Sequence, residues 1–195
     1  MLRRLRFIAS IGLIYIATIG TIAGLLQSPR FLAAQAVAEP PAVQQKEIVK
    51  KPVVISGRPI HISIENTDIN LPLIDGTYDT ATDSWTLSET KAQFATMSSP
   101  ANNQQGTTFI YGHGTAAVFG EISEQHPNLG TLAHVTTDSG HVFTYSLVDV
   151  HDYTPNDTSL LDDLTSGAPR LIVQTCSGAL SQWRTMFIFA YQEVR

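Results

Sequence analysis

The sequence predicts a mainly β fold: a closed or nearly closed barrel of seven or eight short strands with a few short helices, preceded by one N-terminal transmembrane helix. Two observations carry this prediction. After residue 57, short alternating or β-branched runs recur with turn residues between them, as in small all-β domains. Near the N-terminus, residues 7–26 contain no charge, and a helix of this length crosses the apolar core of a bilayer, about 30 Å thick.

The arginines before this uncharged run predict its orientation. Residues 1–6 contain Arg3, Arg4 and Arg6, and basic residues stay on the cytoplasmic side, so the main body of the chain is expected outside the membrane. A cleaved signal peptide is the alternative, because residues 34–36 and 36–38 have the small-x-small form of a cleavage site. The run exceeds the usual apolar core of a signal peptide, about 7–15 residues, which favours an uncleaved anchor. Both alternatives export the rest of the chain.

Residues 27–57 are expected to form a flexible linker, and residues 58–195 one folded domain. The linker segment is rich in Ala, Pro, Gln and Lys and shows no sustained hydrophobic period. The remaining length suits a single domain with a single core.

The first strands of this domain are predicted from alternation and composition. In residues 60–64 the isoleucines alternate with polar residues, so they share one face. Residues 69–73 alternate in the same way, and Pro72 makes this segment an edge strand or a strand end, because proline has no N–H to donate. Residues 107–111 form a compact β-rich run that ends at Gly112.

The later strands are predicted in two pairs. Residues 131–137 and 141–150 flank the sequence Asp138-Ser139-Gly140, which favours a hairpin loop. Residues 170–176 and 185–191 are the last two apolar runs. Short helices are predicted at residues 88–97, where Ser88 is the cap, and at residues 116–123 and 158–164.

Charge and histidine spacing exclude several classes of partner. The net charge is −5, and basic residues cluster only at the N-terminus and at Lys46, Lys50 and Lys51, so nucleic acid is not an expected partner. The six histidines lack the close spacing of a zinc site. The acidic residues form no recognisable calcium-binding loop. Neither a metal nor a cofactor is therefore expected.

The single cysteine, Cys176, stands at the end of the run 170–176. In an exported protein a lone cysteine cannot form an internal disulfide, so it is a reactive thiol, one half of an intermolecular bridge, or an inert buried residue. Arg184 opens the next apolar run, and His113 follows another strand between Gly112 and Gly114. A thiol, a guanidinium and an imidazole at strand ends can face the same groove, which favours a reactive thiol.

These residues carry a resemblance to the sortase family. The sequence Tyr111-Gly112-His113, Phe119 six residues after the histidine, the pair Thr175-Cys176, and Arg184 before an apolar strand resemble the sortase signature. Sortases are membrane-anchored cysteine transpeptidases with an eight-stranded barrel. The resemblance covers about residues 58–195 and extends to the exported N-terminal anchor.

The resemblance implies a role for each matched residue. Cys176 would attack a backbone carbonyl of an LPxTG-like sorting signal and form a thioacyl intermediate. His113 would supply a cation that favours the thiolate, or would protonate the departing amine. Arg184 would hold the substrate and stabilise the oxyanion. Thr175 is a secondary candidate for substrate contact, and Trp183 either lines the groove or packs against the barrel, with packing favoured.

The resemblance also implies partners and a class. The protein partners would be exported proteins with C-terminal sorting signals, and the acceptor would be an amine of a cell-wall precursor or a pilin lysine. Only residues 177–183 separate Cys176 from Arg184, a shorter loop than in the housekeeping sortases, which implies a class E- or F-like or otherwise divergent member.

Two alternatives stay open. The first is an anchored barrel that binds peptides without turnover, although the presence of His113, Cys176 and Arg184 counts against it. The second is another cysteine transpeptidase of the envelope, of the L,D-transpeptidase type. Those enzymes resemble a pattern with histidine and glycine directly before the cysteine, whereas Thr175 precedes Cys176 here.

Overall fold

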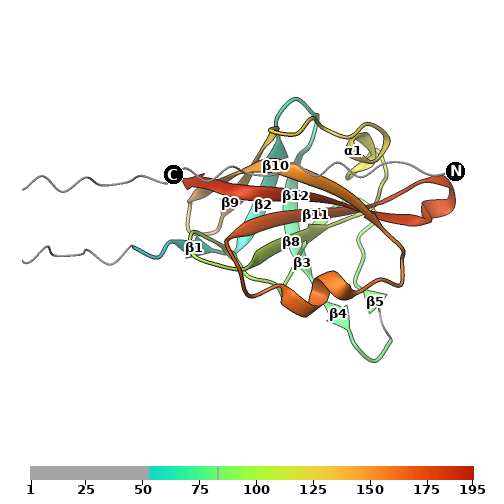
Figure 1. Ribbon diagram of the computed structural model, residues 1–195, viewed down its shortest axis with the longest axis horizontal. Helices are drawn as coiled ribbons and strands as arrows, with labels where there is room; N and C mark the ends of the chain where they lie inside the picture. The colour runs from blue at the N-terminus through green and yellow to red at the C-terminus, as the bar shows by residue number, and fades with distance from the viewer. Residues whose placement is uncertain (1–52, 83) are drawn as a thin grey trace, which may run out of the picture. The chain divides into compact units, whose positions relative to one another are not determined.

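The computed structural model describes residues 53–82 and 84–195 and shows a closed eight-stranded barrel (Figure 1). Around the barrel the strands follow the order β10-β12-β11-β8-β6-β3-β2-β9. Their bounds are β2 (Pro59–Ile64), β3 (Asn70–Gly76), β6 (Ala92–Ala95), β8 (Thr107–Tyr111), β9 (Leu132–Thr137), β10 (Val142–Tyr153), β11 (Arg170–Ser177) and β12 (Trp183–Val194). The predicted mainly β barrel is therefore confirmed.

Smaller elements lie outside the barrel. They are the pair β1 (Ser56–Gly57) and β7 (Ala101–Asn102), the pair β4 (Tyr78–Asp79) and β5 (Ser84–Trp85), the helix α1 (Gly120–Glu124), and the 3-10 helices η1 (Ser159–Asp163) and η2 (Ala179–Ser181). Figure 1 shows the β4–β5 hairpin and the orange coil of η1 on the same side of the barrel. These two insertions bound the groove described below.

One of the three predicted helices is wrong. Residues 88–97 contain strand β6, which pairs with β3 on one side and β8 on the other. All four residues of β6 are buried, so the segment lacks the alternation that marks a half-exposed strand. The predicted helix 116–123 is present only from Gly120 onward, and the predicted helix 158–164 is present as η1.

Strand β3 explains how a proline fits inside the barrel. Residues 70–72 pair with β2, and residues 73–76 pair with β6. Pro72 lies where the partner changes, so it has a paired strand on one side only. The predicted strand end at Pro72 is therefore wrong, because β3 continues to Gly76.

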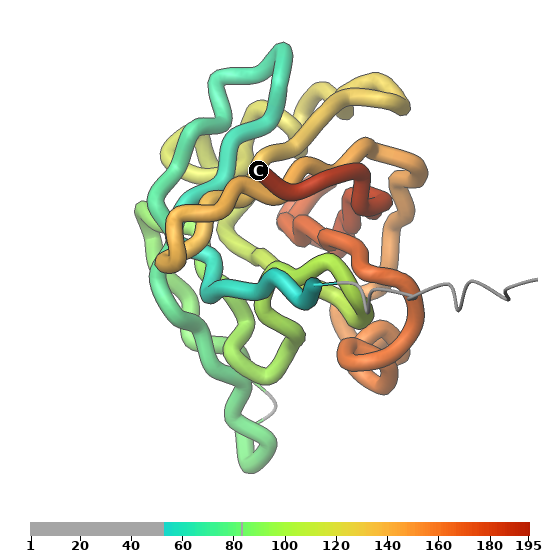
Figure 2. Tube along the Cα trace, turned by 90° about the vertical axis from the view of Figure 1, so that its left-hand side faces the viewer, coloured from blue at the N-terminus to red at the C-terminus, as the bar shows by residue number. Residues whose placement is uncertain are grey.

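The barrel closes where its last strand meets β10. Val142 and Arg195 exchange two backbone hydrogen bonds, of 2.8 and 2.9 Å, and Figure 2 shows the C-terminus beside the start of β10. The hairpin predicted from residues 131–137 and 141–150 is present as β9 and β10, and Gly140 adopts a positive φ of 84° in its turn.

The wall formed by β8, β11 and β12 carries apolar residues on both faces. Leu171, Val173 and Phe187 point into the barrel and join the main core. Alternate residues such as Phe109 and Ile172 point outward and form a second apolar cluster, which Trp85, Leu160 and Leu161 cover. Burial on both faces accounts for the continuous apolar run of residues 171–173. The β4–β5 hairpin and η1 are thus packed on the outside of this wall.

The predicted transmembrane segment, residues 7–26, and most of the predicted linker lie outside the described residues. Among the residues that the structure describes, no helix is long and apolar enough to cross a membrane. The last two linker residues, Ser56 and Gly57, form β1 and pair with β7.

Candidate active site

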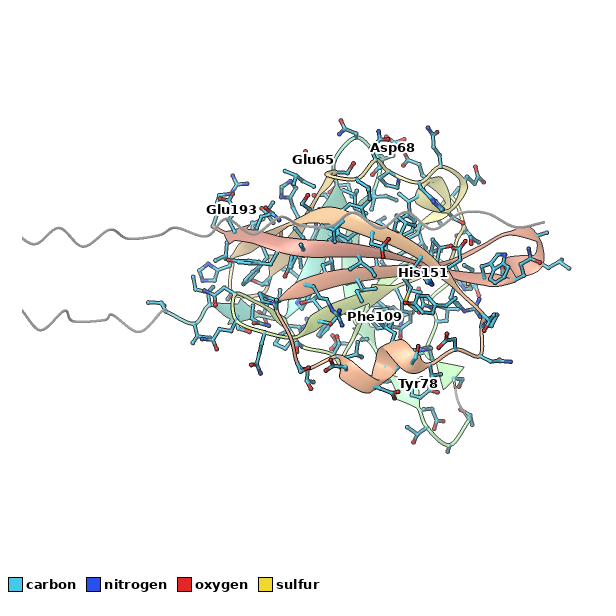
Figure 3. All side chains as sticks on the ribbon, viewed as in Figure 1. Glu65, Asp68, Tyr78, Phe109, His151 and Glu193 are labelled. Atoms are coloured by element: carbon cyan, nitrogen blue, oxygen red, sulfur yellow. The ribbon has the colours of Figure 1, made fainter. Side chains whose placement is uncertain are left out.

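A groove of about 310 Å³ opens over the outer face of β8, β11 and β12. Its floor comes from the strands, one wall from the β4–β5 hairpin and the segment after it, and the other wall from η1 and the residues before it. The floor residues are Tyr111, Gly112, Gln174, Cys176, Arg184 and Met186, and the walls include Tyr78, Trp85, Leu87, Asp157, Leu160 and Leu161. Figure 3 labels Tyr78 and Phe109, which mark the side of the barrel on which the groove lies.

Cys176 and Arg184 are brought together by the antiparallel pairing of β11 and β12. The two residues are direct partners in the ladder, and Arg184 Nη1 donates a hydrogen bond to Cys176 Sγ at 3.2 Å. The same nitrogen donates to the carbonyl oxygen of Ser181 at 3.3 Å. Cysteine acts as a nucleophile in its thiolate form, and this guanidinium lies in contact with the sulfur.

His113 lies in the loop that follows β8, the parallel neighbour of β11. Strands β8 and β11 are parallel, with Tyr111 opposite Gln174, and Gly112 N donates to Gln174 O at 3.1 Å. The ladder ends at this pair, and His113 follows two residues after Tyr111, in the loop beyond β8. The next residue, Gly114, packs so closely on Cys176 that a Cβ at this position would collide with the Cys176 carbonyl oxygen. The thiol and the guanidinium are therefore in contact, and the loop that carries His113 packs against the backbone of Cys176 through Gly114.

The cation in hydrogen-bond contact with the thiol is Arg184. The sequence resemblance had implied that His113 would supply this cation. His113 Nε2 lies 3.7 Å from Glu89 Oε1, a residue of the loop after the β4–β5 hairpin. This carboxylate is largely exposed, so solvent screens the pair. Its other expected role, as the acid that protonates a leaving amine, requires only that His113 reach the groove near the thiol.

The two secondary candidates do not line the groove. Thr175 precedes Cys176 in the strand and so points to the opposite face, where it is fully buried. Its hydroxyl has no hydrogen-bond partner within the described part of the chain. Trp183 pairs with Ser177, lies against Gly178 and is 39% exposed, which agrees with a packing role.

The loop between Cys176 and Arg184 holds an unusual backbone. Leu180 and Ser181 have positive φ angles of 60° and 57°, which are costly for residues with a Cβ. Leu180 is fully exposed. The carbonyl of Ser181 nonetheless reaches the guanidinium of Arg184, so this loop helps to hold the arginine beside the thiol.

The groove walls contain aromatic residues that the sequence analysis did not assign to the site. The Trp85 ring lies on the outer face of the wall, with its centroid 4.6 Å from that of Tyr111 and 5.6 Å from that of Phe109. The Tyr111 hydroxyl donates to Thr86 O at 2.9 Å and ties the hairpin to the wall, and burial raises the pKa of Tyr111. Two aromatic residues on one face of the predicted strand 107–111 could have indicated that another segment of the chain packs over this face.

No three histidine, cysteine or acidic side chains gather closely enough to hold a metal ion within residues 53–82 and 84–195. Asp157, in the groove wall, has its pKa lowered by hydrogen bonds from the side chain and backbone of Ser159. It therefore adds a negative charge to the rim of the groove.

A family model described as the Sortase domain matches residues 62–191. The chain belongs to the sortase family. Sortases are cysteine transpeptidases, and the chain supplies one cysteine, at the groove just described. No curated protein matches the chain.

Solved sortases share the fold of this barrel. Listeria monocytogenes sortase A is 20% identical, with a TM-score of 0.55, over 70% of this chain and 89% of its own. A lid mutant of sortase A from Corynebacterium diphtheriae is 23% identical, with a TM-score of 0.56, over 70% and 72%. Group B Streptococcus Pilus Island 1 sortase C2 is 14% identical, with a TM-score of 0.54, over 68% and 73%. These similarities show that the chain has the same fold as these solved sortases.

Proposed function

We propose that this chain is a membrane-anchored transpeptidase that cleaves an LPxTG-like sorting signal and transfers the exported protein to an amine. The observation that carries the proposal is the 3.2 Å hydrogen bond from Arg184 to the Cys176 thiol at the groove. Membership of the sortase family and the packing of Gly114, next to His113, on the Cys176 backbone support it. The three residues would then act as nucleophile, oxyanion donor and general acid.

In the first half-reaction the Cys176 thiolate attacks the carbonyl carbon of the scissile peptide bond. The guanidinium of Arg184 donates hydrogen bonds to the oxyanion that forms. His113 gives a proton to the leaving amine as the C–N bond breaks, which leaves a thioester on Cys176. In the second half-reaction an acceptor amine attacks the thioester, His113 takes up a proton, and the thiol is released.

The groove supports an extended peptide as the substrate. Its walls combine aromatic and aliphatic side chains, Trp85 on one side and Leu160 and Leu161 on the other, and its floor carries the polar groups that orient a backbone. The short loop between Cys176 and Arg184 leaves this end of the groove uncovered by a long insertion. We assign the chain on this basis to a class E- or F-like or divergent group of sortases.

The proposed partners follow from export. The uncharged run at residues 7–26 and the arginines before it support an anchor with a cytoplasmic N-terminus and an extracytoplasmic catalytic domain. The donors would be exported proteins with C-terminal sorting signals, and the acceptor an amine of a cell-wall precursor or a pilin lysine. Membrane fractionation tests the anchor: the full chain should pellet with membranes, and a chain that lacks residues 1–26 should not.

Turnover by a Cys176→Ala variant tests the enzymatic proposal. The full-length protein is mixed with an LPxTG-like peptide and an amine, and mass spectrometry follows cleavage between Thr and Gly and formation of the new amide. The wild type should form both products and Cys176→Ala neither. Undiminished turnover by Cys176→Ala would contradict the mechanism, and peptide binding without turnover by the wild type would favour the binding barrel.

A further inference from the structure

The backbone carbonyl of Cys176 accepts its hydrogen bond from a side chain and not from the neighbouring strand of the sheet. On the edge of β11 that faces β8, Gln174 O accepts a hydrogen bond from Gly112 N at 3.1 Å. The next carbonyl on that edge, two residues on, belongs to Cys176. Its donor is the hydroxyl of Ser123, in α1, at 2.7 Å. Helix α1 therefore holds the end of the strand that presents the thiol.

Three hydrogen bonds lead in sequence from His113 to Cys176. Phe119 N donates to His113 O at 3.0 Å, and Ser123 N donates to Phe119 O at 3.0 Å. Ser123 Oγ then donates to Cys176 O at 2.7 Å. The first two bonds are made by the backbone and survive a change of side chain. The third depends on one hydroxyl, so Ser123 is the point at which this connection can be cut.

Packing makes this connection stiff. Phe119 is fully buried in the barrel core and anchors the start of α1. Gly114 lies directly on the Cys176 carbonyl, and a Cβ there would meet Ser123 Oγ at 3.2 Å as well. The loop that carries His113 is thus held against the cysteine backbone from one side by Gly114 and from the other by Ser123.

We propose that Ser123 is a positioning residue that sets the distance between the His113 imidazole and the Cys176 thiol and thereby the reactivity of the thiol. The inference rests on the proposed role of Cys176 as the nucleophile. The other charged groups near the thiol are Arg184 from β12, Glu89 beside His113, and Asp157 from the groove wall. A change at Ser123 leaves all of them in place. Ser123 does not line the groove, so it acts on substrate only through the catalytic residues.

Alkylation of the thiol in the full-length protein tests this role. Cys176 is the only cysteine of the chain, so the mass added by iodoacetamide reports this thiol alone. Ser123→Ala should react about tenfold more slowly near neutral pH, and its pH profile should differ from that of the wild type, because a misplacement of about 1 Å between reacting groups can cost a rate factor of up to about 10². Ser123→Thr keeps the hydroxyl and should keep the rate and pH profile of the wild type. In peptide turnover, Ser123→Ala should lower kcat and leave KM unchanged.

Ser98 provides a matched control. Its hydroxyl donates to the carbonyl oxygen of Ala95, also at 2.7 Å, in a buried position outside the groove. Ser98→Ala removes the same kind of bond, together with the bond of 3.1 Å that Phe109 N donates to the Ser98 hydroxyl, and should lower the melting temperature without altering the alkylation profile. If Ser123→Ala has the same rates and pH profile as the wild type, the positioning role is wrong.

Gly114→Ala gives an independent test that leaves the Ser123 hydroxyl in place. The added methyl must displace the Cys176 carbonyl, so this variant should also slow alkylation, and a wild-type profile would contradict the inference. Alkylation needs no peptide substrate. A negative result here therefore leaves the Cys176→Ala turnover test intact, whereas turnover by Cys176→Ala would overturn the proposed function itself.

Discussion

One guanidinium nitrogen of Arg184 donates hydrogen bonds to two acceptors. Its Nη1 donates both to the thiol of Cys176 and to the carbonyl of Ser181, so the guanidinium is fixed in position before any substrate binds. A guanidinium carries further N–H donors in a rigid plane, which can meet the oxyanion without reorganisation. The positive φ angles at Leu180 and Ser181 are the local cost of this placement.

Arg184→Lys tests whether the planar geometry of the arginine matters. A lysine keeps the charge but not the fork of donors, so kcat/KM for peptide cleavage should fall about 10²–10³-fold, the usual effect of losing an oxyanion donor. Arg195→Ala is the control, because Arg195 pairs with Glu193 at the far end of β12. Steady-state kinetics measure both variants, and wild-type kcat/KM in Arg184→Lys would show that charge alone suffices.

Among the secondary-structure elements, the β4–β5 hairpin and η1 form the two walls of the groove, and the barrel strands form its floor. Each strand of the hairpin has only two residues, so its position depends on the ring contacts of Trp85 and on the bond from Tyr111 to Thr86. The hairpin is therefore expected to respond to mutation more strongly than the barrel strands do.

Trp85→Ala should raise KM for the peptide while changing kcat little. The indole is part of the groove wall and lies away from the Cys176–Arg184 pair, so its loss removes binding surface. The free energy of unfolding should also fall by about 1–3 kcal/mol, because the ring is only partly buried. Leu129→Ala, at an exposed loop position, should change neither quantity. Equal losses in kcat and kcat/KM for Trp85→Ala would instead place the indole in the chemistry.

The strands at both sides of the site could be predicted from sequence, and the groove walls could not. Residues 171–173 are apolar on both faces, and the run ends soon after at the only cysteine, so strand and thiol are recognisable together. Strand β6 is equally buried but short, and its four residues fit a helix as well as a strand. The hairpin has no period at all. The role of Ser123 depends on how α1 approaches β11, which no local pattern encodes.

At the scale of the whole domain, two apolar clusters share the wall of β8, β11 and β12. One fills the barrel and the other lies beneath the groove. Because the catalytic strands belong to both clusters, their ends are held from two sides. Tyr145 lies in the inner cluster, where burial raises its pKa well above the usual value despite a hydrogen bond from Thr108. Burial also raises the pKa of Tyr111 in the outer cluster.

Because the pKa values of these two tyrosines are raised in the folded domain, we expect the domain to lose stability at alkaline pH. The folded domain keeps them protonated, whereas in the unfolded chain they ionise at about pH 10. Their contribution to stability is therefore complete below about pH 10 and is lost as pH rises above it. Urea unfolding at increasing pH should show this fall for the wild type and a shallower fall for Tyr145→Phe, which cannot ionise. An unchanged free energy of unfolding above about pH 10 would contradict the burial of these phenols.

The central claim is that Cys176 forms a covalent bond with a sorting peptide, and trapping that bond tests it most directly. The full-length protein is incubated with an LPxTG-like peptide in the absence of an acceptor amine, quenched in acid, digested and sequenced by mass spectrometry. We expect a thioester between the threonine carbonyl of the peptide and Cys176, absent from Cys176→Ala and released when an amine is added. Cleaved peptide with no adduct on Cys176, or an adduct on another residue, would contradict it.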